Sequence, residues 1–216
     1  MATLPEIKTT SIRYSVAEIL RAAIREGRFV PGEDLSEVKL AAELKVSRGP
    51  IREAMLVLTE EGLLTYSQNR GFHVLELTAE DRANIDRVRL PLEILALQSA
   101  KERCTPADLR RLQKLKDQLI QQIRKGPFSA RDSAEIAFHS AIWNLSGNEW
   151  LVAALQRIMV PYFTYGRVLQ LTTPRPDLMA DQHQAYLDFL SGESKATAEE
   201  CVRFHLTGTS AFPQHG

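Results

Sequence analysis

The sequence lacks several features that would point directly to a class of function. It has only two cysteines, Cys104 and Cys201, and their wide separation argues against a disulfide framework or a paired-cysteine site. Lysine plus arginine and aspartate plus glutamate both number 27, so no overall charge attracts nucleic acid or a membrane. The longest apolar run, residues 150–163, is short and interrupted, and the N-terminus lacks a secretion signal. We therefore expect a cytoplasmic protein without a membrane partner.

The N-terminal third carries signals for three helices followed by a β-hairpin. Apolar residues at helical spacing, serine caps and glycine stops predict helices at 11–27, 36–44 and 47–62, and alternating residues around a Gln-Asn-Arg-Gly turn predict two strands within 63–77. The second and third helices meet across a tight turn. This order predicts a winged helix-turn-helix domain at residues 1–77.

The third helix begins with the stretch VSRGPIREAM, in which Ser47 is expected to supply the N-cap oxygen. Pro50 falls in the first turn, where a missing N–H costs little. Ile51, Ala54, Met55 and Leu58 share the core-facing arc, and a neighbouring arc carries Arg48, Gly49 and Arg52.

Arginines near the start of a helix that follows a tight turn are typical of helices that read the major groove. Ser47, Arg48, Gly49 and Arg52 are therefore the candidate DNA-binding residues of the helix, and Arg70 and Gly71 those of the wing. The alternative is a solvated arginine face paired with Glu43 and Glu53. Residues 1–77 contain ten basic and eleven acidic side chains, so strong binding would need two copies on a short palindrome.

From Thr78 onward the sequence predicts an all-α bundle of six or seven helices, residues 78–216. The expected helices are 79–103, 106–125, 130–145, 148–170, 178–191 and 197–208. Pro91 and Pro161 fall inside two of them and should kink or break them. The aromatic side chains are expected to be core residues rather than a binding box: Trp143, Trp150, Tyr162 and Tyr165.

Three histidines of this region, together with one carboxylate, form a candidate metal site. Glu135 and His139 share a helix face at i, i+4 spacing, and His183 and His205 lie on two later helices. Three imidazoles and a carboxylate suit Zn, Ni, Fe or Mn. The spacing leaves open that each histidine is an ordinary core or surface residue, and a metal-dependent enzyme would use the same ligands.

Two further polar residues can be interpreted from the sequence alone. Arg89 stands four residues before Glu93, which favours a surface ion pair. Asn148 follows Gly147 at a helix boundary, where it either marks the boundary or reaches a ligand.

The stretch PGEDLSEVKLAAELKVSRGPIREAMLVLTEEGLL, with RG further on, resembles the DNA-binding domain of the GntR family of bacterial transcription regulators. Residues 78–210 are similar to the FCD domain of its FadR subfamily, through RVRLPLE, the E-x-x-x-H pair before SGN, and the motifs around His183 and His205. Here Glu135 stands where that family usually has aspartate.

This resemblance implies a dimeric, ligand-responsive regulator that binds operator DNA and is not an enzyme. It also implies a divalent metal held by Glu135, His139, His183 and His205, beside a small carboxylate effector that contacts Arg89 and Asn148. A metal-responsive repressor is the main alternative, and a metal-dependent enzyme is the second.

Overall fold

The computed structural model describes residues 12–169 and 176–207. The chain divides into two compact units, Met1–Glu76 and Leu77–Gly216. Four expected features lie outside the described residues: the helix start at Ser11, the helix ends at Gln170 and Gly208, and most of the TTPRPD linker at 172–175. Within the described ranges, no helix combines the length and the apolar character needed to cross a membrane.

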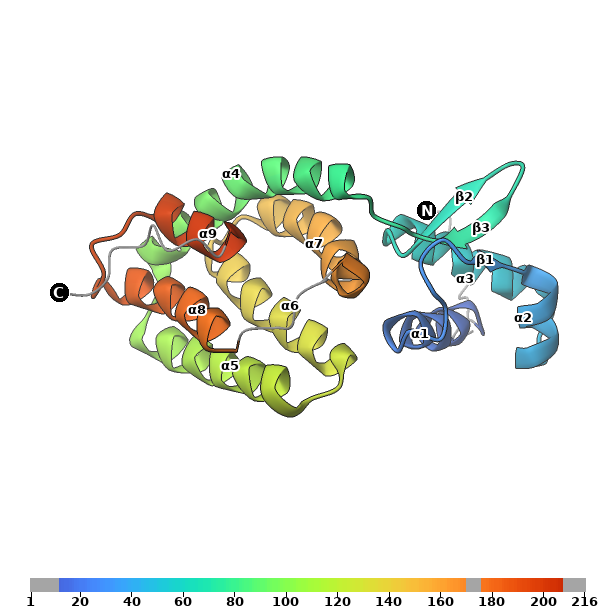
Figure 1. Cartoon of the computed structure of the whole chain (residues 1–216), viewed down its shortest axis with the longest axis horizontal. Helices are drawn as coiled ribbons and strands as arrows, with labels where there is room; N and C mark the ends of the chain where they lie inside the picture. The colour runs from blue at the N-terminus through green and yellow to red at the C-terminus, as the bar shows by residue number, and fades with distance from the viewer. Residues whose placement is uncertain (1–11, 170–175, 208–216) are drawn as a thin grey trace, which may run out of the picture. The chain divides into compact units, whose positions relative to one another are not determined.

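From residue 12 onward, the N-terminal unit contains three helices and a small antiparallel sheet (Figure 1). The helices are α1 (Ile12–Arg25), α2 (Glu37–Leu44) and α3 (Arg48–Glu60), and the strands are β1 (Asp34–Leu35), β2 (Leu64–Ser67) and β3 (Gly71–Val74). The predicted hairpin is β2–β3, with Ser67 opposite Gly71. The sequence did not predict β1, which pairs Leu35 with Phe72 on the other side of β3.

The turn between α2 and α3 fixes the start of α3. Lys45 ends α2 in the left-handed conformation, with φ 54° and ψ 41°. Ser47 occupies the N-cap position of α3 with extended backbone, but its hydroxyl makes no capping hydrogen bond, so the expected N-cap oxygen was wrong. The predicted core face of α3 is confirmed, because its apolar residues Ile51, Ala54, Met55 and Leu58 are fully buried.

The second unit is all-α, as predicted, and its described residues form six helices: α4 (Ala79–Arg103), α5 (Pro106–Lys125), α6 (Phe128–Leu145), α7 (Glu149–Leu169), α8 (Pro176–Ser191) and α9 (Ala198–Thr207). Helices α4 and α5 each begin with a capping box, formed by Thr78 with Asp81 and by Thr105 with Asp108. Both pairs have the three-residue spacing that is typical of this motif. Helix α6 begins two residues before its predicted start, at Phe128 rather than Ala130.

Helix α4 lies along the bundle and contacts α6, α7, α8 and α9 (Figure 1). It continues unbroken through Pro91, and α7 likewise runs through position 161, so neither proline breaks its helix. The main core joins α4, α5, α6, α8 and α9 around Leu97, Phe138 and Tyr186. Trp143 is buried as expected, whereas Trp150 is 89% exposed, so its assignment to the core was wrong.

Candidate functional site

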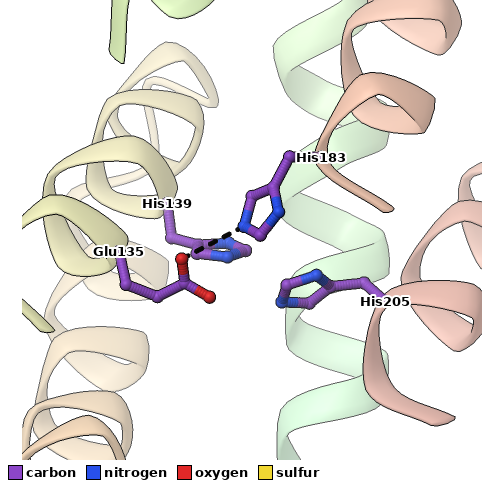
Figure 2. Close-up of side chains that lie close together, drawn as sticks. All are labelled: Glu135, His139, His183 and His205. Atoms are coloured by element: carbon purple, nitrogen blue, oxygen red, sulfur yellow. Dashed lines mark ion pairs between the residues drawn. The ribbon is translucent and has the colours of Figure 1, made fainter. Parts of the chain in front are cut away.

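Three helices bring the four predicted metal ligands together. Glu135 and His139 come from α6, His183 from α8 and His205 from α9, and their side chains converge on one point (Figure 2). One ligand atom from each residue lies within 4.8 Å of the other three. Glu135, His139 and His183 are buried, and His205 is half-buried. The sequence alone could not link these helices, because nothing local in it places α8 and α9 beside α6.

Burial and mutual charge set the protonation of the three imidazoles. Burial, followed by the neighbouring His183 and Arg89, holds the pKa of His139 well below its usual range. Burial and the other two histidines do the same to His205. Burial also acts to lower the pKa of His183, but the charge and hydrogen bonding of Glu135 raise it overall. Neutral imidazoles carry the nitrogen lone pairs that a metal requires.

The backbone orients His183 toward the cluster. Its Nδ1 lies 2.6 Å from the carbonyl oxygen of Met179, which accepts a hydrogen bond from the Nδ1–H group. This contact leaves Nε2 directed at Glu135. Nε2 is 3.2 Å from Glu135 Oε2. His205 Nδ1 is buried and has no hydrogen-bond partner within 12–169 and 176–207. Such an atom in an apolar helix bundle is costly unless a ligand satisfies it, so the donor set fits a divalent cation.

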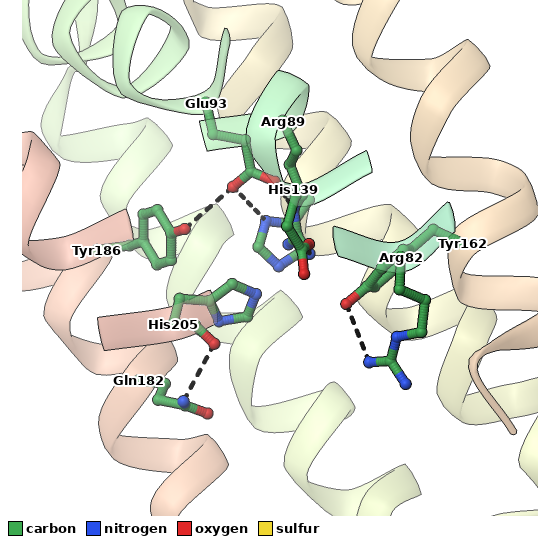
Figure 3. Close-up of polar contacts among 9 residues, drawn as sticks. Arg82, Arg89, Glu93, His139, Tyr162, Gln182, Tyr186 and His205 are labelled. Atoms are coloured by element: carbon green, nitrogen blue, oxygen red, sulfur yellow. Dashed lines mark hydrogen bonds and ion pairs between the residues drawn. The ribbon is translucent and has the colours of Figure 1, made fainter. Parts of the chain in front are cut away.

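A second buried network adjoins the cluster and centres on Glu93 of α4 (Figure 3). Glu93 Oε1 accepts from Arg89 Nε at 2.5 Å, Oε2 accepts from the Tyr186 hydroxyl at 3.1 Å, and His139 Nδ1 lies 3.9 Å from Oε2. Only 2% of Arg89 and of Glu93 is exposed, so the surface pair expected from their spacing is in fact buried. Although burial opposes it, the charge of Glu93 raises the pKa of Arg89.

Tyr162 connects this network to Arg82. The ring centre of Tyr162 is 5.1 Å from the guanidinium carbon of Arg89, and its hydroxyl accepts from Arg82 Nη2 at 3.3 Å. Sequence reasoning named Glu93 only as a partner of Arg89, assigned Tyr162 to the core, and did not identify Tyr186. The only local signal was the i, i+4 spacing of Arg89 and Glu93, which says nothing about burial.

Asn148 begins helix α7. Its side-chain oxygen accepts from the backbone N–H of Leu151 at 3.1 Å, which makes it a helix cap, and the residue is exposed. It borders a surface depression of about 310 Å³ together with Gly147 and Glu149. No contact within the described ranges joins Asn148 to the histidine cluster.

The two candidate DNA-binding arginines of α3 lie beside one carboxylate. Glu37 of α2 contacts Arg48 at 3.3 Å and Arg52 at 2.7 Å, so it replaces the partners Glu43 and Glu53 expected from the sequence. Tyr66 and Glu37, in that order, raise the pKa of Arg52. Both arginines are reachable by a ligand, since their side chains are 67% and 47% exposed.

The two candidate glycines differ in what their backbone requires. Gly71 has φ 75°, which favours glycine at the end of the hairpin loop, and Arg70 beside it lies 3.4 Å from Asp34. Gly49 needs no special conformation, and a Cβ there would meet nothing within 4 Å. Gly49 is thus exposed at the start of α3 with space around it. Ser47 is exposed as well, and its hydroxyl makes no capping hydrogen bond.

Residues 13–74 match the family described as bacterial regulatory proteins of the gntR family, and residues 85–208 match the FCD domain. The chain belongs to the GntR family. This GntR-family protein is 34% identical over 180 residues to the Nta operon transcriptional regulator of Aminobacter aminovorans, covering 82% of this chain and 81% of that one. It is 30% identical over 202 residues to the HTH-type transcriptional regulator YdhC of Bacillus subtilis, covering 91% and 88%.

The solved structure of McbR/YncC from E. coli has the same fold as this GntR-family protein. The TM-score is 0.72 at 25% sequence identity, with 93% of this chain and 95% of that chain covered. The protein is a transcription regulator with a GntR DNA-binding domain and an FCD domain. Its relatives are regulators rather than enzymes, so the metal-dependent enzyme considered from the sequence is set aside.

Proposed function

We propose that this regulator binds a short palindromic operator as a homodimer, and that a small organic acid bound beside a divalent metal changes this binding. The observation that carries the proposal is the convergence of four ligand atoms from α6, α8 and α9 within 4.8 Å. In an FCD domain, such a buried donor set is suited to binding a metal ion beside an effector, whereas a solvated group of charges would lie on the surface. Cytoplasmic operator DNA is its expected partner.

Glu135, His139, His183 and His205 would hold the metal, with Zn, Ni, Fe or Mn as the candidates. A bound divalent cation supplies a Lewis-acid position for a carboxylate oxygen. The chain's own contribution is orientation: Met179 fixes the tautomer of His183, and Glu93 lies on the far side of the His139 ring.

Arg89 would hold the effector's carboxylate. Its Nε is engaged by Glu93 and its Nη1 lies 4.0 Å from Asp86 Oδ1, so the effector would have to compete with Asp86 for the terminal nitrogens beside Tyr162. A buried guanidinium in fixed geometry binds a carboxylate in two-pronged fashion far better than a flexible amine. Asn148 is the second proposed effector contact, and it would have to release its capping bond to Leu151 or use its amide N–H groups.

DNA recognition is assigned to α3 and to the hairpin. Arg48 and Arg52 project from the start of α3, and the backbone at Ser47 and Gly49 leaves room for close approach to a duplex. Arg70 and Gly71 at the hairpin loop would contact the neighbouring groove or phosphates. Arg52→Ala should then weaken operator binding by about 1–3 kcal/mol without loss of fold.

The proposal is tested by metal analysis followed by operator binding. The full-length protein is purified without added metal, its metal content is measured, and an operator is selected from a random duplex pool. Binding to this operator is then titrated with and without a chelator, and with a panel of small mono- and dicarboxylic acids. We expect about one divalent metal per chain and at least one acid that changes operator affinity only in the metal-loaded protein.

Two outcomes would replace this proposal. If chelation alone abolishes or induces operator binding and no acid has an effect, the metal itself is the signal and the protein is a metal-responsive repressor. If the purified protein binds no divalent metal at micromolar concentration, the four-residue cluster is a structural polar core instead.

A further inference from the structure

Glu37 lies where the two helices of the helix-turn-helix meet. It is the first residue of α2, and its carboxylate faces the start of α3. One oxygen, Oε1, is 2.7 Å from Arg52 Nη1, and the other, Oε2, is 3.3 Å from Arg48 Nη2. The Glu37 side chain is 16% exposed, much less than either arginine. A single sheltered carboxylate therefore bridges Arg48 and Arg52, the two arginines of α3 that are assigned to DNA.

Arg52 is also held from the hairpin side. Its guanidinium carbon lies 5.4 Å from the ring centre of Tyr66 and 5.7 Å from that of Phe72, and these two rings pack at 4.8 Å from each other. Phe72 is buried in the sheet and Tyr66 is exposed, so Phe72 is the fixed member of this aromatic pair. Cation–π contacts on one side and a carboxylate on the other leave Arg52 little rotamer freedom. Glu37 engages one of the five N–H groups of Arg52, and Tyr66 also interacts with the guanidinium, so only the remaining N–H groups can reach an acceptor.

Charge neutralisation by Glu37 has a further consequence for binding. Non-specific DNA affinity comes from arginines and lysines that replace the counterions of phosphates. Residues 1–77 contain ten basic and eleven acidic side chains. With so few basic side chains, each arginine that is neutralised locally lowers the non-specific attraction to DNA noticeably. An arginine already paired to a carboxylate gains less from a phosphate than an unpaired one. The bridge should thus lower affinity for any duplex that offers phosphates alone.

We propose that Glu37 is a specificity-determining residue, which presets Arg52 for a base contact and keeps Arg48 and Arg52 from binding phosphates indiscriminately. This inference rests on the proposed assignment of both arginines to DNA. The looser partner is Arg48, at the longer distance and with the greater exposure, so it exchanges Glu37 for a phosphate first. Arg52 stays oriented by Glu37, Tyr66 and Phe72 while it contacts a base.

A purely structural role for Glu37 makes a different prediction. An acidic residue in the first turn of a helix stabilises that helix through its dipole. Loss of this effect would lower the melting temperature of the protein but would leave DNA discrimination and its salt dependence unchanged. Both quantities therefore separate the two roles.

The test compares Glu37→Gln with the wild type in the full-length protein. Dissociation constants are measured at several salt concentrations for a duplex selected by the wild type and for a shuffled duplex of equal composition. We expect the variant to bind the shuffled duplex more tightly and with a steeper salt dependence. The slope of log affinity against log salt concentration should become more negative by about 0.9 for each added phosphate contact. The ratio between shuffled and selected duplexes should fall about tenfold, as for the loss of one oriented base contact.

Two further variants make the result specific. Glu43→Gln removes the same charge from an exposed position on α2 and should match the wild type in both ratio and salt dependence. Glu37→Asp keeps the negative charge at the helix start but is one methylene shorter, so it should lose discrimination while the dipole effect is retained. It also replaces Glu37→Gln if that variant fails to fold.

The outcomes separate this inference from the assignment of the arginines. If Arg52→Ala weakens binding to the selected duplex but the Glu37 variants behave like Glu43→Gln, Glu37 has no part in specificity and only this inference is overturned. If Arg52→Ala binds as the wild type does, or if the wild type enriches no sequence, the DNA-binding assignment fails and this inference fails with it.

Discussion

At the scale of single residues, His183 is the ligand whose geometry is most fully determined, because Met179 fixes its Nδ1 and Glu135 faces its Nε2. Changing His183 to Ala removes one of four ligands, so metal affinity should fall by more than about tenfold, since even a lost orienting partner costs that much. Metal content after dialysis measures the effect. His73→Ala, a change in strand β3, is the matched control and should retain full occupancy. Full occupancy of His183→Ala would make His183 a packing residue.

The histidine cluster also predicts how the metal-free protein responds to acid. The folded-state pKa values of His139 and His205 lie below the ordinary 6.5, so their contribution to stability is present above pH 6.5 and is lost as the pH falls. His183, with a raised pKa, acts in the opposite direction: its contribution is present below pH 6.5 and is lost as the pH rises. Because the pKa values of His139 and His205 are held well below 6.5 while that of His183 is only raised, we expect acid to destabilise the metal-free protein.

Thermal unfolding of chelator-treated protein between about pH 7.5 and about pH 5.5 tests this expectation, because histidine in the unfolded chain titrates in that interval. The melting temperature should drop on acidification, and His139→Gln should reduce the drop because glutamine does not titrate. A melting temperature that rises toward pH 5.5 would mean that the His183–Glu135 pair dominates.

Which residues form the site could be predicted only in part. The four proposed ligands follow from their chemistry and from resemblance to the FCD domain, and the structure brings all four side chains together. The surroundings of Arg89 could not be predicted, because α4 contacts four helices and carries polar residues on most of its circumference. Periodicity identifies a buried face only when one side of a helix is polar. Burial of the Arg89–Glu93 pair is a property of the assembled bundle.

At the scale of helices and strands, local chemistry predicted the bounds well where it was strong. The ranges of α4 and α5 match the predicted ones at both ends. Their starts are well defined because each helix begins with a threonine and an aspartate that cap each other. Strand β1 was missed because it is two residues long and exists only through pairing with β3, far along the chain. Pro91 was expected to kink or break α4, yet losing one backbone hydrogen bond, to the carbonyl of Arg87, did not end a helix packed on several sides.

The capping box of α5 supports a stability prediction. Thr105 Oγ1 accepts from the Asp108 N–H at 3.2 Å, and Asp108 Oδ2 accepts from the Thr105 N–H at 3.0 Å. Thr105→Ala should therefore cost about 1 kcal/mol of unfolding free energy. Both tryptophans of the chain lie in the helical unit, so tryptophan fluorescence in urea reports on this unit. Thr105→Ser keeps the hydroxyl and should unfold like the wild type, and equal losses in both variants would contradict the capping role.

At the scale of the whole molecule, the neutral DNA-binding unit makes the assembly decisive. Its eleven acidic and ten basic side chains provide little non-specific attraction, so useful affinity has to come from two units acting together. Light scattering should give twice the chain mass of 24.3 kDa. A duplex with one scrambled half-site should bind at least about a hundredfold more weakly than the full palindrome. A monomeric mass, or equal binding to both duplexes, would contradict the homodimer.

Regulation requires that the acid-binding site and the DNA-binding unit be coupled. If an acid bound at Arg89 changes operator affinity by some factor, operator DNA must change the affinity for that acid by the same factor. Couplings of this kind commonly fall at about 5–150-fold, which calorimetry can resolve in both directions. Arg89→Lys keeps the charge opposite Glu93 but loses the fork. It should bind the acid at least about tenfold more weakly while operator affinity without acid stays at the wild-type level. A coupling factor of one in the metal-loaded wild type would mean that the acid binds without regulating.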